Sequence, residues 1–394
     1  RRDPSVVMRL KRLGSLHQSR LSFMRILTRR LAGEGWSFSR PVFEIDVRGV
    51  GQAVYTARGP DRAYSLVAFA HDLPTEKRSD RVIADAWDAT FTLFDGEPGP
   101  DDLARLAQNV PYQEAGRVSE SELSLSRANR SVRLWSHVVD SLAAGRQPDQ
   151  QMIDEVGYLM RTTAVYGSGK FGAADREKIA DRLEMQVPFQ AEMLSVYLIR
   201  TFVRDLVQHM ADAKGGAASV TLDPAIACRL GIGNSTGLGM APFLFNNWII
   251  AREEALARVR GVEWARAEDV SLFRELLQRA GASVGRWRSA HPLQTEKIAA
   301  LRQDLAAIQR QVAEHDFDAP GPWDRLFSWA EDVLSEEGQE FLASLMLEPY
   351  GALVDGVSEC MADQNSDAFR IDGALNRLSE RRVDNQGGSL LAAT

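Results

Sequence analysis

The segment best suited to hold a small ligand is CRLGIGNSTGLGMAPF, residues 228–243. It contains four glycines together with Asn234, Ser235 and Thr236, and Arg229 adds a positive charge. Glycine lets a ligand approach the main chain, and free amide groups before a helix bind anions. We therefore predict that this segment binds a carboxylate or a phosphate. The alternative is a packed crossing at which glycines let two helices approach.

A second candidate is SLSRANRSVRLWSHVVD, residues 124–140, which we predict to be helical. Arg127, Arg130 and Arg133 recur at every third position, so in a helix they would share one face. Guanidinium groups gathered in this way bind carboxylate or phosphate in bidentate fashion. Arg130 is therefore a predicted substrate ligand. The alternative is that these arginines form salt bridges with acidic residues of the protein.

Three further side chains could move protons. In residues 158–176 an apolar helix is expected to end in a glycine turn that carries Tyr166 and Lys170, with Arg161 before it as an anion ligand. His71 directly follows a predicted strand and could act as a general base, because the reference pKa of imidazole is about 6.5. The alternatives are an ordinary solvent-exposed turn and a solvated or capping histidine.

The familiar cofactor motifs are incomplete. A phosphate-binding P-loop would need glycine and Ser or Thr where Ala164 and Phe171 stand. A dinucleotide fingerprint would need glycine at Thr236. The six histidines form no HExxH pair, and Cys228 and Cys360 are nucleophile candidates by residue type alone. We therefore predict neither a cofactor nor a metal.

The elements that would position these residues follow from hydrophobic periodicity. Residues 5–33 and 79–96 are predicted helices, and residues 41–72 alternate in the manner of a three-stranded antiparallel meander. Downstream the pattern is helical, with its strongest element at 188–216. The narrow apolar seam of 293–314 is expected to pack on one neighbour, residues 266–281.

These elements predict an α+β fold, mainly helical, with a small antiparallel sheet near the N-terminus. The turn-rich stretch DGEPGPDD, residues 95–102, is the best candidate for a boundary. We expect residues 1–97 to hold the basic helix, the sheet and a helix, residues 98–380 to form a helical domain, and residues 381–394 to be an extended tail.

The charge distribution bears on partners. The net charge of −7 disfavours a protein that coats nucleic acid, yet residues 1–30 carry nine Arg or Lys against one acid. This basic segment either docks on the acidic remainder or binds an acidic partner, a membrane surface or nucleic acid. The sequence has no apolar run long enough to span a membrane, and its two cysteines fit a reducing compartment, which favours the cytoplasm.

Two functions remain in view. The first is an enzyme that uses acid–base chemistry of the lyase, isomerase or hydrolase type on a small anionic substrate. It requires the basic and hydroxyl side chains of distant segments to converge. The second is an interaction protein that works through the basic first helix. Long apolar helix faces also favour a homo-oligomer.

Overall fold

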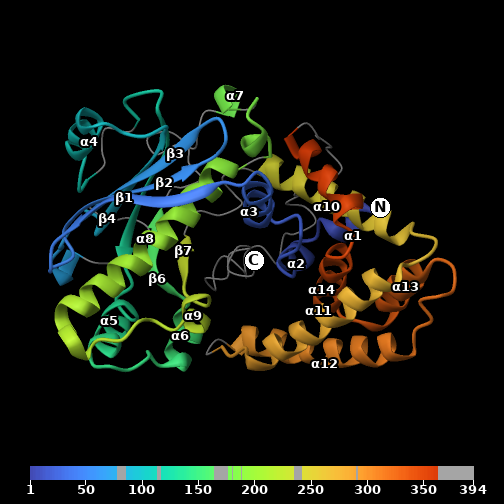
Figure 1. Ribbon diagram of the computed structural model, residues 1–394. Helices are drawn as coiled ribbons and strands as arrows, with labels where there is room; N and C mark the ends of the chain where they lie inside the picture. Colours follow the sequence, from blue (N-terminus) through green and yellow to red (C-terminus); the bar gives the residue numbers. More distant parts are fainter. Residues whose placement is uncertain are drawn as a thin grey trace. The chain divides into compact units, whose positions relative to one another are not determined.

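The computed structural model describes residues 1–77, 86–112, 117–163, 176–179, 181–187, 189–234, 242–289 and 292–362 (Figure 1). The chain divides into two compact units. One, the sheet unit, is Leu27–Thr236; the other, the helical unit, joins Arg1–Ile26 to Gly237–Thr394. The helical unit is therefore built from both ends of the sequence.

A single seven-stranded sheet organises the sheet unit, and its strands lie in sequence order. The strands are β1 (Ser37–Ile45), β2 (Gly51–Arg58), β3 (Ala63–Ala70), β4 (Ala89–Asp95), β5 (Glu122–Arg130), β6 (Tyr158–Thr163) and β7 (Gly231–Asn234). Strands β1 to β6 pair antiparallel, and β7 pairs parallel with β6. The α+β class with an antiparallel meander near the N-terminus is thereby confirmed.

Both faces of this sheet bury apolar side chains. On one face Tyr55 and Phe91 pack edge-on against Phe202 of the long helix α8 (Gln190–Gly215), with ring centroids 6.2 and 5.6 Å away. Because neighbouring residues of a strand point to opposite faces, Val54 faces the other side. There it joins a cluster with Leu106 of α4 (Pro100–Ala107).

The remaining helices of the sheet unit are shorter than α8. They are α5 (Trp135–Ala143), α6 (Gln150–Val156), α7 (Arg176–Ile179), α9 (Pro224–Ala227), η1 (Thr75–Lys77), η3 (Leu183–Met185) and η4 (Gly216–Ala218). Helix α3 (Phe23–Gly33) begins in the helical unit and ends in the sheet unit.

The helical unit contains no strand among its described residues. Its helices are α1 (Pro4–Val7), α2 (Leu10–Leu13), α10 (Pro242–Arg260), α11 (Ala267–Arg286), α12 (Pro292–Glu314), α13 (Pro322–Val333), α14 (Glu336–Leu347), α15 (Gly351–Val354) and η6 (Asp355–Ala362). The seam of α12 is buried through Leu305 and Ile308. Helix α12 contacts α11 as predicted, but it also contacts α14, so the seam packs on two neighbours and not on one. The helices predicted at 188–216 and 293–314 are confirmed.

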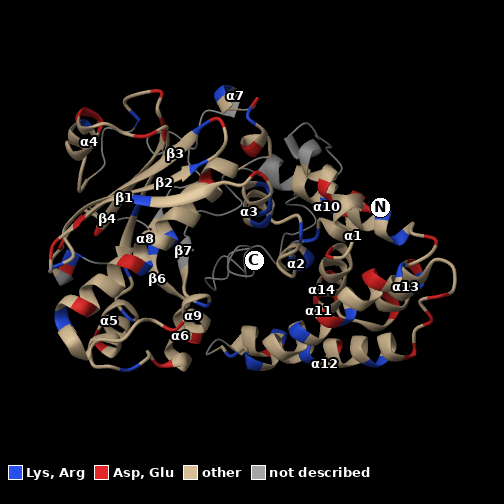
Figure 2. Ribbon diagram, viewed as in Figure 1, with Lys and Arg blue, Asp and Glu red and all other residues tan. Residues whose placement is uncertain are grey.

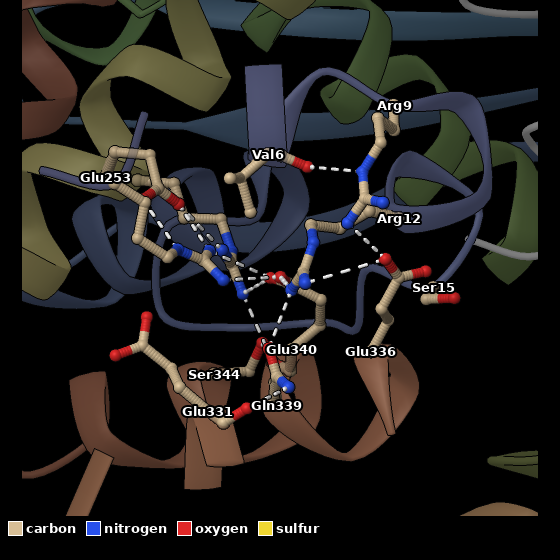
Figure 3. Close-up of polar contacts among 12 residues, drawn as sticks. Val6, Arg9, Arg12, Ser15, Glu253, Glu331, Glu336, Gln339, Glu340 and Ser344 are labelled. Carbon is tan, nitrogen blue, oxygen red and sulfur yellow. Dashed lines mark hydrogen bonds and ion pairs between the residues drawn. The ribbon is translucent and has the colours of Figure 1, made fainter. Parts of the chain in front are cut away.

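The basic N-terminal segment docks within the helical unit. Arg2 bonds to Glu253 at 2.6 Å and to Glu340 at 2.7 Å, and Arg12 also reaches Glu340 at 2.7 Å. Figure 3 shows Arg12 pointing to Glu340 on α14, with Glu253 of α10 nearby. Arg252 completes the group at 2.8 Å from Glu340. The expectation that this segment docks on the protein itself is confirmed for these residues.

Four expected helices differ from the structure. Residues 89–95, 122–130 and 158–163 are strands β4, β5 and β6, whereas residues 135–140 of the predicted helix 124–140 do belong to a helix, α5. In β4 and β5 small polar and apolar residues alternate with a period of two, which suits a pleated strand with both faces buried. The predicted helix 5–33 is three short helices, α1, α2 and α3.

The expected domain boundary near residue 97 also differs from the division seen. The expected boundary falls between β4 and β5. These strands pair along their length, for example at Phe91 and Ser126. Hydrogen bonds between neighbouring strands thus join the two sides of the turn-rich stretch. The tail expected at 381–394 lies outside the described residues.

No helix in the described ranges is long and apolar enough to cross a membrane. Acidic and basic residues are interspersed along the long helices α8 and α12, whereas α2 and α3 carry basic residues only (Figure 2).

Candidate functional site

The candidate site lies where β3 ends and β4 begins. His71 follows β3, Asp88 precedes β4, and Asn129 and Arg130 end β5. Pairing of Ala70 with Ala89, and of Ala89 with Ala128, brings these positions to the same end of the sheet. We call the side chains gathered there the sheet-end cluster: His71, Trp87, Asp88, Thr90, Arg127, Asn129, Arg130 and Trp135.

Asp88 is the centre of the sheet-end cluster. Its Oδ2 accepts a hydrogen bond of 3.0 Å from the main-chain N–H of Arg130, whose Nε lies 3.7 Å from Oδ1. The main-chain N–H of Asp88 donates to Asn129 Oδ1 at 3.0 Å, and its carbonyl accepts from the N–H of His71 at 2.8 Å. The side chain of Asp88 is fully buried and that of Arg130 is only 5% exposed, so this ion pair is little screened by water.

Local packing fixes the guanidinium of Arg130. It lies 5.1 Å from the ring centroid of Trp135, the first residue of α5, and NH2 lies 3.4 Å from the carbonyl oxygen of His71. Gly49 is close by, with a φ of 78°. A Cβ there would come within 3.3 Å of Arg130 NH2 and 2.7 Å of Met210 Sδ, so glycine keeps this space open.

Burial keeps His71 neutral. Desolvation is the main cause that lowers the pKa of His71 below its usual 6.5, and the cation of Arg130 lowers it further, whereas Asp88 opposes the change. At neutral pH the imidazole therefore has a nitrogen able to accept a proton. Its Nε2 is buried and has no hydrogen-bond partner among the described residues.

The sheet-end cluster contains other buried donors. Trp87 Nε1, Trp135 Nε1, Asn129 Nδ2 and Thr90 Oγ1 are all buried, and none has a hydrogen-bond partner in the part of the chain that the structure describes. Each such group costs about 1–3 kcal/mol when it is left unsatisfied. A bound molecule rich in acceptor oxygens would remove that cost.

Strand register connects further arginines to the cluster. The Arg127 guanidinium lies 4.2 Å from the ring centroid of Trp87, and Arg127 pairs with Thr90. Arg161 of β6 pairs with Asn129. Directly paired residues project from the same face, so Arg127, Asn129 and Arg161 share the face opposite to that of Arg130.

The structure brings only some of the predicted site residues together. His71 and Arg130 are in contact, Arg161 lies one strand away, and Asn234 ends β7 beside Thr162. Tyr166, Lys170, Ser235 and Thr236 lie outside the described residues.

Arg229 is held elsewhere. Its guanidinium forms an ion pair with Asp154 of α6 and a hydrogen bond of 3.2 Å to Gln150. Arg229 therefore links the chain after α9 to α6. Asp154 neutralises its charge and Gln150 accepts a hydrogen bond from it.

Sequence reasoning missed Asp88, Asn129 and the two tryptophans. Asp88 and Trp87 fall within the predicted helix 79–96. Asn129 lies between Arg127 and Arg130, and the prediction for that segment considered only its arginines. The alternation of ATFTLFD, residues 89–95, would have placed Asp88 at the start of a strand, where polar side chains are often functional.

The described residues contain no group of three or more His, Cys, Asp and Glu side chains that could hold a metal. Comparisons with protein-family models, with curated proteins and with solved structures gave no match.

Proposed function

We propose that the protein is an enzyme that uses acid–base chemistry on a small anionic substrate, and that the sheet-end cluster is its substrate site. The observation that carries the proposal is a half-buried imidazole, with a lowered pKa and a buried Nε2, in a cluster with several buried donors that have no partner among the described residues. A carboxylate or phosphate supplies the acceptor oxygens that these donors require. Lyase, isomerase and hydrolase reactions all use such a proton acceptor.

Each side chain has a role in this proposal. His71 takes the proton, and Asn129, Thr90 and the Trp87 N–H group hold the substrate oxygens. The Asp88–Arg130 pair positions the chain around His71, because it joins the ends of β3, β4 and β5. Arg127 and Arg161 add positive charge that attracts the anion.

Binding of simple anions tests the site. We expect inorganic phosphate, malonate or phosphoglycolate to bind the protein in calorimetric titrations. Asn129→Leu and Thr90→Val should each weaken that binding about tenfold, the usual effect of removing one hydrogen bond to a charged group. Thr201→Val, which removes an exposed hydroxyl of α8 that bonds only its own helix, is the control and should change nothing.

The role of His71 makes a separate prediction. His71→Gln should leave anion binding within a few-fold of the parent but abolish turnover once a substrate is known. Turnover should fall as the pH drops through a value below 6.5, because protonation removes the base. Absence of binding by all three anions, or equal binding by the Asn129 and Thr90 variants, would refute the site.

The other function, an interaction protein that uses the basic first helix, has less support. Arg2 and Arg12 already bond to Glu340, and Arg25 bonds to Glu348 at 2.6 Å, so these charges are satisfied within the helical unit.

Two finer expectations remain proposals. A cytoplasmic location is supported by the exposed free thiol of Cys228, which suits a reducing compartment. A homo-oligomer through long apolar helix faces has lost its main support, since Phe202, Leu206, Leu305 and Ile308 are already buried within their own units.

A further inference from the structure

A pocket of about 430 Å³ lies within the helical unit, well apart in sequence from the sheet-end cluster. Its walls come from the chain after α2, the end of α11, the first turns of α12 and the start of α14. Leu16 and Leu301 form an apolar base and are almost completely buried. A cavity of this size is within the usual range for small-molecule sites.

One wall of this pocket is aromatic. The indole of Trp287 is 39% exposed, and the imidazole of His17 lies 6.5 Å from it at an interplanar angle of 23°. The Trp287 carbonyl accepts hydrogen bonds of 2.7 Å from both Arg288 and Arg302, which fixes its main chain at the end of α11. The exposed part of the indole offers a flat ring a surface on which to stack.

The carboxylate of Glu337 also lines the pocket, and one of its oxygens has no hydrogen-bond donor among the described residues. Glu337 Oε1 lies 2.8 Å from His17 Nε2. The second oxygen, Oε2, is buried and accepts no hydrogen bond from any described residue. A buried carboxylate oxygen needs a donor, and an ammonium group would satisfy both its hydrogen-bonding capacity and its charge.

The ammonium group of Lys297 belongs to another wall of the pocket. Lys297 is half-buried, and its Nζ lies 3.4 Å from the carbonyl oxygen of Gly14, which is a long contact. Among the described residues no carboxylate lies within ion-pair distance of it. A half-buried ammonium group in this position is suited to a ligand carboxylate.

From these three features we infer that the pocket binds a free aromatic amino acid. The ligand's ring would stack on Trp287, its ammonium group would bind Glu337 Oε2, and its carboxylate would bind Lys297. This is a binding site in its own right and does not depend on the proposed acid–base activity, so either proposal can fail alone.

The test uses the full-length protein and three ligands that share a phenyl ring. L-phenylalanine carries both charges, 2-phenylethylamine lacks the carboxylate, and 3-phenylpropionate lacks the ammonium group. Saturation-transfer NMR and calorimetry should show L-phenylalanine binding at least about tenfold more tightly than either analogue, since each lacks one charge-assisted contact. L-tyrosine and L-tryptophan are titrated alongside.

Three variants assign the contacts. Lys297→Met should weaken L-phenylalanine about tenfold and leave 2-phenylethylamine unchanged, whereas Glu337→Gln should weaken L-phenylalanine and leave 3-phenylpropionate unchanged. Trp287→Leu should weaken all three ligands. The matched controls are exposed residues of the same types, namely Lys214→Met, Glu275→Gln and Trp264→Leu.

Two results would overturn the inference. One is the absence of binding by all three aromatic amino acids at millimolar concentration to protein whose far-UV circular dichroism is normal. The other is binding that the Lys297 and Glu337 variants both leave unchanged.

Discussion

At the scale of single residues, the best-defined buried charge is Glu340 of the helical unit. Burial alone would raise the pKa of Glu340, but attraction to Arg252 and Arg2, with hydrogen bonds from Arg2 and Arg12, lowers it to about 2. Because the folded pKa lies below the usual 4.5, ionised Glu340 stabilises the protein above that pH. The stabilisation is lost as the pH falls towards 2.

Replacement of this carboxylate should be costly. We expect Glu340→Gln to lower the free energy of unfolding at pH 7 by about 3–5 kcal/mol, because three buried guanidinium groups lose a shared partner. Urea unfolding measured from pH 7 to pH 2 should also show a shallower decrease on the acid side than in the parent protein.

A surface carboxylate provides the comparison. Glu254→Gln removes a partly exposed group that pairs with Arg1 and Arg258, and it should cost less than about 1 kcal/mol. Equal losses for the two variants would contradict the importance assigned to the buried network.

Single-residue chemistry was partly visible in the sequence. His71 and Arg130 were selected by type and position, and they are in contact in the structure. Asp88 was not selected, because its importance comes from a main-chain partner 42 residues away, at Arg130. Sequence spacing does not show such contacts.

At the scale of elements, the packing of α5 on α8 depends on Gly215, the last residue of α8. A Cβ at this position would lie 2.3 Å from the carbonyl oxygen and 2.7 Å from the Cα of Ala143, both main-chain atoms of α5. The two helices can approach this closely only because the residue has no side chain.

Gly215→Ala should therefore lower the free energy of unfolding of the sheet unit by about 1–3 kcal/mol, the usual cost of overpacking. Thermal and urea unfolding measure the effect. Gly33→Ala is the control, since Gly33 also ends a helix, α3, and a Cβ there meets nothing within 4 Å. A Gly215 variant as stable as the Gly33 variant would be inconsistent with the close contact.

The sequence predicted some elements better than others for a physical reason. Helices α8 and α12 show a clear helical period, since each has a polar side to contrast with its buried side. In residues 41–72 the turn residues between the strands mark the meander, although β3 is buried on both faces. Strands β4 and β5 are buried on both faces, apart from residues such as Arg127. These strands mainly alternate small polar residues, and not charged ones, with apolar residues. The helical assignments at 79–96 and 124–140 followed residues typical of helix ends and the arginine spacing instead.

At the scale of the whole molecule, the helical unit draws on both ends of the chain. Arg2 bonds to Glu340, which is 338 residues away in sequence. The N-terminal segment supplies two of the three arginines that surround this carboxylate. The helical unit should therefore depend on residues that precede the whole sheet unit.

Deletion of residues 1–22 should destabilise the helical unit selectively. Hydrogen–deuterium exchange should show lost protection in α10 and α14, whose buried carboxylates would keep only Arg252 as a partner, while β2 to β5 stay protected. Deletion of 381–394, the tail expected from the sequence, is the control. Unchanged protection of α14 after the N-terminal deletion would disprove this dependence.

The sequence alone determined the fold class, the meander, the strongest helices and the presence of a charged segment able to dock. These follow from local periodicity and composition, which each segment carries by itself. Tertiary structure decided that β4, β5 and β6 are strands, that His71 meets Asp88 and Arg130, and that Arg229 is held by Asp154. These outcomes depend on pairing between segments that are distant in sequence. The free energy of such a contact depends on both partners, so the sequence of one segment does not predict it.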